Sequence, residues 1–501
     1  MRVPLLAGTS VVLADVPEEI VVLRPLAPGD ALGDVAAAVR DALRFPLAGP
    51  ALHEVAPRGG RATVVVEPPT LPIPGSAFDP REAAVAAAVA ELDAAGIRES
   101  SQTVLVASGL ARRPLGRDLA SLFSFEFRRR FRGRVEVHDV EAEDLAELPA
   151  DGGTPPPRVH RVLADTDLVV TVGAAETVLH GGPAAFVGAA AADTLRGAQA
   201  DSLLETAASG GWRAGLAIER SLATRAPVLG VSLALNHPRL AGTLQGYPFD
   251  PDADARVARS PLRRLFAAVP GALRARLLHT LRIELTANAA FAGPPSVAHA
   301  EALLRAIEAR SASLPGPLDA LVVPVPETTP TLPRESPNPL QAAYLALGLA
   351  LRLWRDAFPV RDGGTVILVN PFRRRFAHPT QSPYRAFFAA ARAGRDPEEL
   401  AAAETAVADD ERALEGYRAG RTCHPLLPFA EWAACEPALG RLGSVLVAEC
   451  RDAAAARQLG LVPVHTLTAA VEMAMARSGG EGRVGVLLCP PYFPLVVGAP
   501  A

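Results

Sequence analysis

The feature that most constrains the fold is an alternation of short apolar runs with helical stretches along the chain. The runs rich in β-forming residues are Thr63–Val66, Thr103–Ala107, Val135–His138, Asp167–Val172, Val228–Leu235, Leu318–Val325, Thr365–Val369, Ser444–Ala448 and Val484–Leu488. They rarely alternate with polar residues, which is typical of strands buried on both faces in parallel sheets. Strands that alternate with helices at this spacing predict an α/β fold.

The helical stretches lie between these runs. The clearest is Arg81–Ala95, because Asp79 can cap it, Pro80 fits its first turn and Gly96 can end it. Further helices are expected at Leu115–Phe131, Gln341–Ala357, Pro397–Tyr417, Asp452–Leu459 and Thr466–Ala476.

The length of the chain predicts more than one domain, since 501 residues exceed one ordinary core. Proline is dense at 294–295 and 315–339, which indicates a change of domain near 295–315. We therefore expect two α/β domains, residues 1–295 and 296–501, with mostly parallel sheets and an interdomain cleft. Two segments interrupt the alternation of strands and helices and are predicted insertions. One, expected to be helical, spans about 248–291 and the other about 377–441.

Composition excludes several classes of partner. The apolar fraction of 49% and the charged fraction of 21% describe a globular protein, and the net charge of −4 offers no basic field for nucleic acid. No apolar run approaches the roughly 18 residues of a membrane span. We therefore expect neither nucleic acid nor a membrane as partner. Four widely spaced cysteines and an N-terminus unlike a signal peptide favour a cytoplasmic protein.

The chain contains no lysine, so all 50 residues counted as lysine or arginine are arginine. A GC-rich genome would produce such a bias. Whatever its cause, the chain can form no Schiff base, no lysine-tethered cofactor and no P-loop lysine contact.

One glycine-rich loop places polar groups at a strand end. The run Leu168–Val172 is followed by a loop that holds Glu176, His180, Gly181 and Gly182. Ligands of open α/β sheets bind at the carboxyl ends of strands. A carboxylate beside an imidazole can orient it and raise its pKa, so His180 and Glu176 are our candidate catalytic residues. The alternative for His180 is a loop histidine bonded to the backbone.

Two further groups of basic residues follow strand ends and are candidates for binding an anionic substrate. They are Arg112 and Arg113 after the run Thr103–Ala107, and Arg373, Arg374, Arg375 and His378 after the run Thr365–Val369. Guanidinium groups bind carboxylate or phosphate through paired hydrogen bonds. The alternatives are a solvated helix start for the first group and a surface loop for the second.

Several ordered pieces of the chain resemble the lactate racemase family, the nickel-pincer 2-hydroxyacid racemases. The strand and glycine-rich loop around His180 are similar to a strand, histidine and loop of that family. Further similar pieces, in the same order, are VVVEPPTLPIPG (Val64–Gly75), VLVASGLARRPLG (Val104–Gly116), VEVHDVEAEDL (Val135–Leu145), PNPLQAAYLAL (Pro337–Leu347) and GGTVILVNPF (Gly363–Phe372). The resemblance covers nearly the whole chain and implies the family's fold.

The resemblance also implies where the family's catalytic groups fall. That family exchanges protons with two histidines, anchors a nickel-holding cofactor on a lysine and ligates the metal with a further histidine. The second catalytic histidine matches His180, whereas the first falls on Ala111 and the lysine falls on Ala190. No histidine lies between His180 and His237. We therefore predict no cofactor and no metal site.

The substrate-binding positions of the family fit in part. Its glutamine matches Gln341 and its later lysine falls on Tyr344, while the acidic residue of its D-x-T-R motif falls on Pro68, or on Glu67 if the loop slips by one. We expect Gln341 and Tyr344 to line the cleft with the arginine groups.

Three hypotheses follow. The first is a lactate-racemase-like protein that has lost nickel-pincer catalysis and binds a small anionic ligand in the cleft. The second is an active isomerase that uses His180 and a cofactor held without a covalent bond. The third is a non-catalytic subunit of a complex. The sequence leaves open whether the protein is an enzyme, which ligand it binds and whether it forms oligomers.

Overall fold

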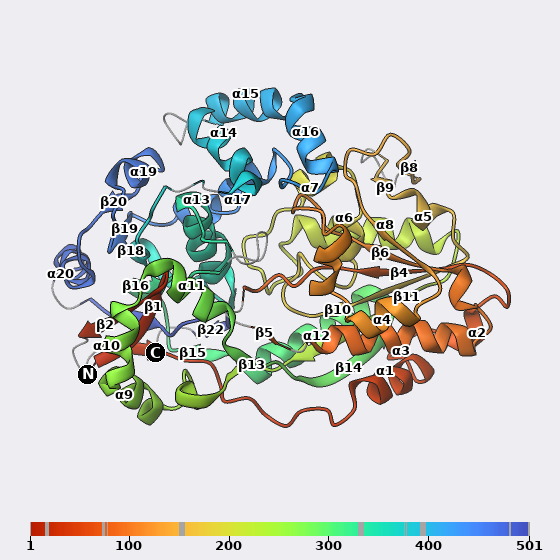
Figure 1. Cartoon of the computed structure of the whole chain (residues 1–501), viewed down its shortest axis with the longest axis horizontal. Coiled ribbons are helices and arrows are strands. Elements are labelled where there is room, and N and C mark those ends of the chain that lie inside the picture. Colours follow the sequence, from red (N-terminus) through yellow and green to blue (C-terminus); the bar gives the residue numbers. More distant parts are fainter. Residues whose placement is uncertain are drawn as a thin grey trace.

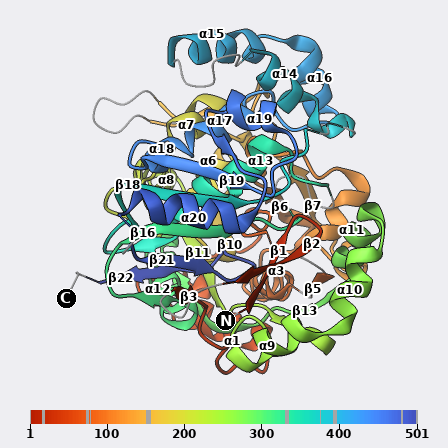
Figure 2. The same ribbon diagram turned by 90° about the vertical axis from the view of Figure 1, so that its left-hand side faces the viewer.

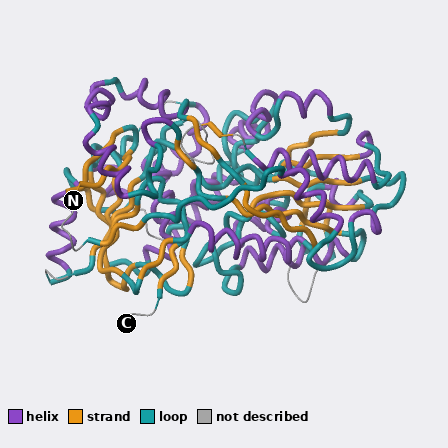
Figure 3. The backbone as a smooth tube through the Cα atoms, turned by 90° about the horizontal axis from the view of Figure 1, so that it is seen from below, coloured by secondary structure: helices purple, strands orange, loops and turns teal. Residues whose placement is uncertain are grey.

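The computed structural model describes residues 2–15, 20–72, 76–77, 79–149, 156–328, 335–374, 376, 378–390, 397–479 and 482–498. Two six-stranded sheets lie in two lobes, each with helices around its sheet (Figures 1 and 3). The strands of both sheets are parallel with one exception, so the predicted α/β class with mostly parallel sheets is confirmed.

The first lobe is built on a sheet with the strand order β14-β11-β10-β4-β6-β7. Its strands are β4 (Ala62–Val66), β6 (Gln102–Val106), β7 (Arg134–Val137), β10 (Leu168–Ala174), β11 (Val228–Leu235) and β14 (Ala287–Gly293). All pair in parallel except β14, which runs antiparallel to β11. The carboxyl ends of β4, β6 and β10 therefore meet at one edge of the sheet.

Helices cover both faces of this sheet. Helices α1 (Val35–Arg44) and α3 (Pro80–Ala94) share an apolar core with one face, and α6 (Ala184–Gly188) and α8 (Gly210–Ala223) pack on the other. Helix α12 (Pro295–Arg310) packs on β11 and β14. As expected, Asp79 caps α3, and its Oδ1 accepts a hydrogen bond from the Arg81 N–H at 3.0 Å.

The second lobe is built on an all-parallel sheet with the order β20-β19-β18-β16-β21-β3. Its strands are β3 (Val21–Leu23), β16 (Leu318–Pro324), β18 (Val360–Val369), β19 (Ser444–Ala448), β20 (Val462–Pro463) and β21 (Val484–Leu487). Helix α20 (Leu467–Arg477) covers one face together with the hairpin of β1 (Arg2–Ala7) and β2 (Ser10–Asp15) (Figure 2). The chain thus begins in the second lobe, crosses to the first and returns. The boundary expected between residues 295 and 296 stays a prediction.

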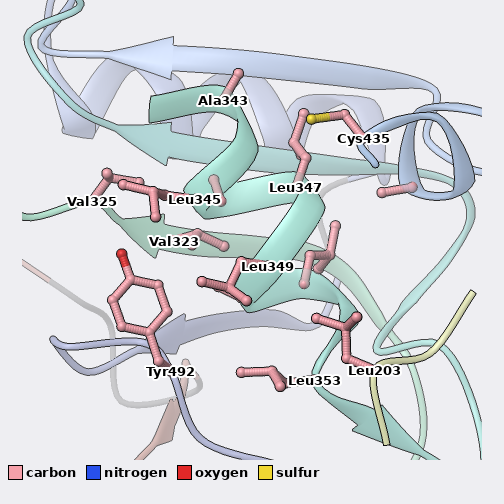
Figure 4. Close-up of a cluster of buried hydrophobic side chains, with 14 of the residues drawn as sticks. Leu203, Val323, Val325, Ala343, Leu345, Leu347, Leu349, Leu353, Cys435 and Tyr492 are labelled. Atoms are coloured by element: carbon pink, nitrogen blue, oxygen red, sulfur yellow. The ribbon is translucent and has the colours of Figure 1, made fainter. Parts of the chain in front are cut away.

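The other face of the second sheet carries a fully buried, irregular helix. The expected single helix Gln341–Ala357 is instead α13 (Pro339–Ala343), a π-helical turn η4 (Tyr344–Leu349) and a 3-10 turn η5 (Ala350–Arg352). The segment ends there because Trp354 pairs with Leu495 of strand β22 (Leu495–Val497). Leu345, Leu347 and Leu349 point into a core shared with β16 and Tyr492 (Figure 4).

Two other expected helices are each broken in two. The stretch Leu115–Phe131 forms the 3-10 helix η2 (Gly116–Ser121) and α4 (Phe125–Arg130), because the Ser124 side chain caps a new helix start. The stretch Pro397–Tyr417 forms α15 (Pro397–Ala408) and α16 (Glu411–Arg418), because Asp410 caps the second helix.

The segment expected as a helical insertion at 248–291 is helical only in its first part. It contains α9 (Pro251–Arg259), α10 (Pro261–Ala268) and α11 (Gly271–His279), followed by strands β13 (Arg282–Glu284) and β14. The strands were missed because the small residues of β14 carry little β signal, and pairing with β11 decides their conformation. No helix of the described ranges is long and apolar enough to span a membrane.

The remaining elements are short or peripheral. They are α2 (Leu52–Val55), β5 (Ser76–Ala77), η1 (Glu99–Ser101), β8 (Ala146–Glu147), β9 (Arg158–Val159), α5 (Arg161–Ala164), α7 (Ala192–Gly197), β12 (Arg239–Leu240), η3 (Gly242–Leu244), β15 (Ala312–Leu314), β17 (Trp354–Arg355), η6 (Pro379–Gln381), α14 (Ser382–Ala390), α17 (Leu427–Ala433), α18 (Glu436–Leu439) and α19 (Ala453–Gln458).

Candidate functional site

A pocket of about 220 Å³ lies where the two lobes meet. From the first lobe it is lined by the segments that follow the carboxyl ends of β4, β6 and β10. From the second lobe it is lined by η4, η5 and α17. Its polar lining residues are Glu67, Thr70, Ser108, Thr177, His180, Gln199, Tyr344, Arg352 and Glu431. The position agrees with the rule that ligands of α/β sheets bind beyond the carboxyl ends of strands.

His180 lines this pocket from the loop between β10 and α6. Its Nδ1 lies 3.3 Å from the Thr177 hydroxyl. The next two residues, Gly181 and Gly182, have φ values of +84° and +53°. A β-carbon on Gly182 would lie 2.3 Å from Cβ of His299 on α12, so only glycine lets the loop approach that helix. The loop is therefore fixed against α12, with His180 at the pocket wall.

Glu67 is the second titratable group of the pocket and follows β4 directly. Its carboxylate accepts a hydrogen bond from the Gly181 N–H at 2.5 Å, which places it beside the His180 loop. Burial, with a smaller contribution from the charge of Glu176, raises the pKa of Glu67 to about 8. Burial lowers the pKa of His180 to about 4. At pH 7 the pocket therefore holds a protonated carboxyl and a neutral imidazole, a proton donor and a proton acceptor.

The Glu176 carboxylate is hydrogen-bonded to groups other than His180. Its Oε2 accepts hydrogen bonds from the Thr70 N–H at 2.9 Å and from Arg81 at 3.1 Å. Arg81 also pairs with Asp79 at 2.8 Å. The charge of Glu176 favours the protonated imidazole, but desolvation outweighs it and lowers the pKa of His180. Glu176 instead fixes the loop after β4, which carries Glu67 and Thr70.

Arg112 and Arg113 hold chain segments together and do not line the pocket. Arg112 pairs with Asp118 at 2.8 Å and donates to the Gly420 carbonyl at 3.1 Å. Arg113 donates to the carbonyls of Val137, His138 and Arg418. Arg113 bonds backbone carbonyls of both lobes, and Arg112 bonds one carbonyl of the second lobe.

Gln341 and Tyr344 were both predicted to line the cleft, but only Tyr344 lines the pocket. Burial raises the pKa of the Tyr344 hydroxyl. Gln341 is fully buried behind it, where its amide accepts from the Asn338 N–H and donates to the Tyr384 hydroxyl at 3.1 Å.

The loop after β18 lies away from the pocket. Arg373 is exposed there, and Arg374 is held by Gln458 and Asp452. His378 is mostly exposed and lies 3.1 Å from a carboxylate oxygen of Glu335. Arg375 lies outside the described residues. Among the described members of this group, none lines the pocket.

Sequence reasoning missed six polar residues of the pocket: Thr70, Ser108, Thr177, Gln199, Arg352 and Glu431. The hydroxyls of Thr70 and Ser108 are more than nine-tenths buried and have no hydrogen-bond partner among the described residues. Arg352 is almost fully buried and donates to four carbonyls, those of Ala200, Asp201, Gly348 and Ala434. No described carboxylate forms an ion pair with it. Ser108 follows β6 closely, so the strand-end rule could have indicated it; Arg352 had no such signal.

Comparison with known proteins shows what this chain is similar to. Residues 8–194 match the family described as lactate racemase N-terminal domain. This segment of the chain is therefore similar to the lactate racemase N-terminal domain. The lactate racemase apoprotein from Thermoanaerobacterium thermosaccharolyticum has a similar structure, with a TM-score of 0.60 and 15% identity over 99% of this chain and 100% of that one.

A second structure shares the lactate racemase fold. It is a structural genomics protein from Thermotoga maritima, with a TM-score of 0.51 and 14% identity over 94% of this chain and 99% of its own. No curated protein sequence matches this chain. At these identities the structural matches establish the fold of the lactate racemase relatives over almost the whole chain.

The residues present do not fit the lysine-anchored nickel cofactor of lactate racemases. The position of the anchoring lysine is Ala190, whose side chain is fully buried against α6 and whose carbonyl accepts a hydrogen bond from His138 at 2.8 Å. The chain has no lysine at all. Among the described residues, no group of three histidine, cysteine or acidic side chains could hold a metal.

Proposed function

We propose that this lactate racemase relative binds a small anionic molecule of the 2-hydroxy acid class in the pocket between its lobes, without nickel-pincer catalysis. The observation that carries the proposal is the polar pattern of the pocket. The hydroxyls of Thr70 and Ser108, which have no partner in the described part of the chain, share it with the Arg352 guanidinium, whose charge no described carboxylate pairs. Hydroxyls can bond the substrate's hydroxyl, and the positive charge favours its carboxylate.

The protonation of Glu67 supports an anionic ligand. A carboxyl with a pKa of about 8 is neutral at pH 7 and repels no incoming carboxylate. We also propose a cytoplasmic location, supported by four cysteines that are free and buried.

Calorimetry with matched acids tests the proposal. Lactate and larger 2-hydroxy acids should bind, whereas the corresponding acids without the hydroxyl should bind more weakly. Ser108→Ala should weaken binding about threefold to tenfold, since a lost hydrogen bond contributes about 0.5–1.5 kcal/mol. Ser313→Ala, at an exposed position far along the chain, is the control. Absence of binding by every carboxylate, or nickel-dependent racemisation, would refute the proposal.

One observation favours a second function, an isomerase that needs no lysine-anchored cofactor. Glu67 and His180 line one pocket and carry opposite proton roles at pH 7. Such a pair can move a proton to or from a substrate carbon. Exchange of the C2 hydrogen of a bound 2-hydroxy acid with solvent deuterium would support this function. Native mass spectrometry would show any cofactor held without a covalent bond.

A further inference from the structure

Helices α10 and α11 carry an exposed set of leucines that no other described element covers. Leu262 and Leu265 on α10 are 51% and 65% exposed, and Leu273 and Leu277 on α11 are 49% and 43% exposed. The spacings i,i+3 and i,i+4 place each pair on one face of its helix. We call these four residues the leucine patch. No residue of α10 is buried, so the helix presents apolar surface where a soluble helix normally presents polar groups.

The same segment is strongly basic, although the chain as a whole is acidic. Between Asp254 and Glu284 there are seven arginines and no acidic residue, against a net charge of −4 for the chain. Arg259, Arg264 and Arg276 are exposed. Positive charge and exposed leucines therefore coincide on one peripheral pair of helices, at the lower left of the molecule near the N-terminus (Figure 1).

Helices α10 and α11 pack against each other and against neighbouring elements. The Arg274 guanidinium lies over the Phe266 ring at 6.0 Å, which links α11 to α10. Leu278 is buried, and α10 contacts β2 and α9. The inward side of the pair is thus occupied by its own contacts, and the leucine patch faces outward.

We propose that the leucine patch and its flanking arginines dock this protein on an anionic lipid surface. Apolar side chains on short amphipathic helices insert at the boundary of headgroups and acyl chains, and arginines pair with anionic headgroups. The segment between Asp254 and Glu284 carries arginines and no acidic residue, which complements a negatively charged membrane. Our expectation of no membrane partner rested on the lack of spanning segments, and docking on a surface requires none.

Co-sedimentation of the full-length protein with lipid vesicles tests the proposal. We expect binding to vesicles that contain phosphatidylglycerol, little binding to phosphatidylcholine vesicles, and weaker binding at high salt. Replacing the four leucines of the patch by serine should lower the affinity more than about tenfold. The variant R264Q/R276Q should lower it several-fold on anionic vesicles alone.

Matched substitutions elsewhere serve as controls. Leu304→Ser changes a leucine that is 44% exposed on α12, and R128Q/R129Q removes two exposed arginines of α4. Both should bind vesicles as the unmodified protein does. Failure to bind anionic vesicles, equal binding to both lipids, or equal loss in patch and control variants would overturn the proposal. Self-association that the leucine variant abolishes, without vesicle binding, would assign the patch to a second copy and would likewise overturn it.

Discussion

Glu67 and His180 show how one physical cause acts oppositely on an acid and a base. Both lose water on burial, and desolvation disfavours whichever form is charged. The pKa of the carboxyl therefore rises to about 8, whereas the pKa of the imidazole falls to about 4. Their shared neutrality at pH 7 follows from burial in one pocket.

The Glu67 carboxyl should make stability depend on pH. Its pKa in the folded state exceeds the unfolded value of 4.5, so the native state holds the proton more tightly between pH 4.5 and 8. The associated stabilisation is complete below pH 4.5 and is lost as pH rises through 8. Urea unfolding should be measured from pH 4.5 to 9 for the unmodified protein and for Glu67→Gln. The free energy of unfolding of the unmodified protein, relative to that of the variant, should fall by a few kcal/mol over this range. A constant difference would contradict the assigned pKa.

Gly182 and Gly116 offer a matched test of the loop that carries His180. Both have positive φ, +53° and +57°, but only Gly182 has a close neighbour, the Cβ of His299. Gly116→Ala should destabilise by about 1 kcal/mol through backbone strain. Gly182→Ala should destabilise by about 2–4 kcal/mol, because the added methyl must displace the α12 side chain. Thermal unfolding measures both, and equal losses would refute the packing argument.

The site was only partly predictable because its residues meet through packing. His180 and Tyr344 were indicated by a strand-end loop and by resemblance to lactate racemases, and both line the pocket. Glu67 was predicted only as an alternative to Pro68 for the acidic residue of the D-x-T-R motif. Arg112 and Arg113 follow a strand end and could bind an anion. They instead donate hydrogen bonds to carbonyls of segments far along the chain, which the sequence did not indicate.

At the scale of elements, strands were easier to predict than helices. The run Val228–Leu235 coincides with β11, since uniformly apolar strands in a parallel sheet have a strong local signal. Helix interruptions depend on single caps and on partners, as Asp410 and the β22 pairing of Trp354 show. The π-helical turn η4 had no sequence signal, although it brings Tyr344 to the pocket.

Arg352 ends this irregular helix and joins elements of both lobes. Arg352→Met would leave the carbonyls of Ala200, Asp201, Gly348 and Ala434 without their donor. We expect a loss of about 3–5 kcal/mol in the free energy of unfolding, since each buried unsatisfied acceptor costs roughly 1–3 kcal/mol and relaxation recovers part. Arg305→Met, whose arginine side chain is 55% exposed, should change stability by less than about 0.5 kcal/mol. Comparable urea midpoints for both variants would rule out this role.

For the molecule as a whole, buried neutral histidines should set the acid limit of stability. Burial lowers the pKa of His138 and His237 to about 3 and of His180 and His299 to about 4. Unfolded histidines titrate near 6.5, so the unfolded state binds more protons between those values and stability falls as pH drops from 6.5. At pH 5 the four should take up nearly four protons on unfolding. The pH dependence of the free energy of unfolding measures this uptake; little change between pH 7 and 5 would contradict it.

The return of the chain to its starting lobe has a consequence for biosynthesis. Strand β3 precedes all strands of the first sheet in the chain, but its only sheet neighbour among the described strands, β21, follows all of them. Meanwhile every strand of the first sheet has already emerged, and domains fold as they are completed during synthesis. The nascent polypeptide must therefore carry β3 without its sheet neighbour while the first lobe folds, and β3 can join the second sheet only after β21 has been translated.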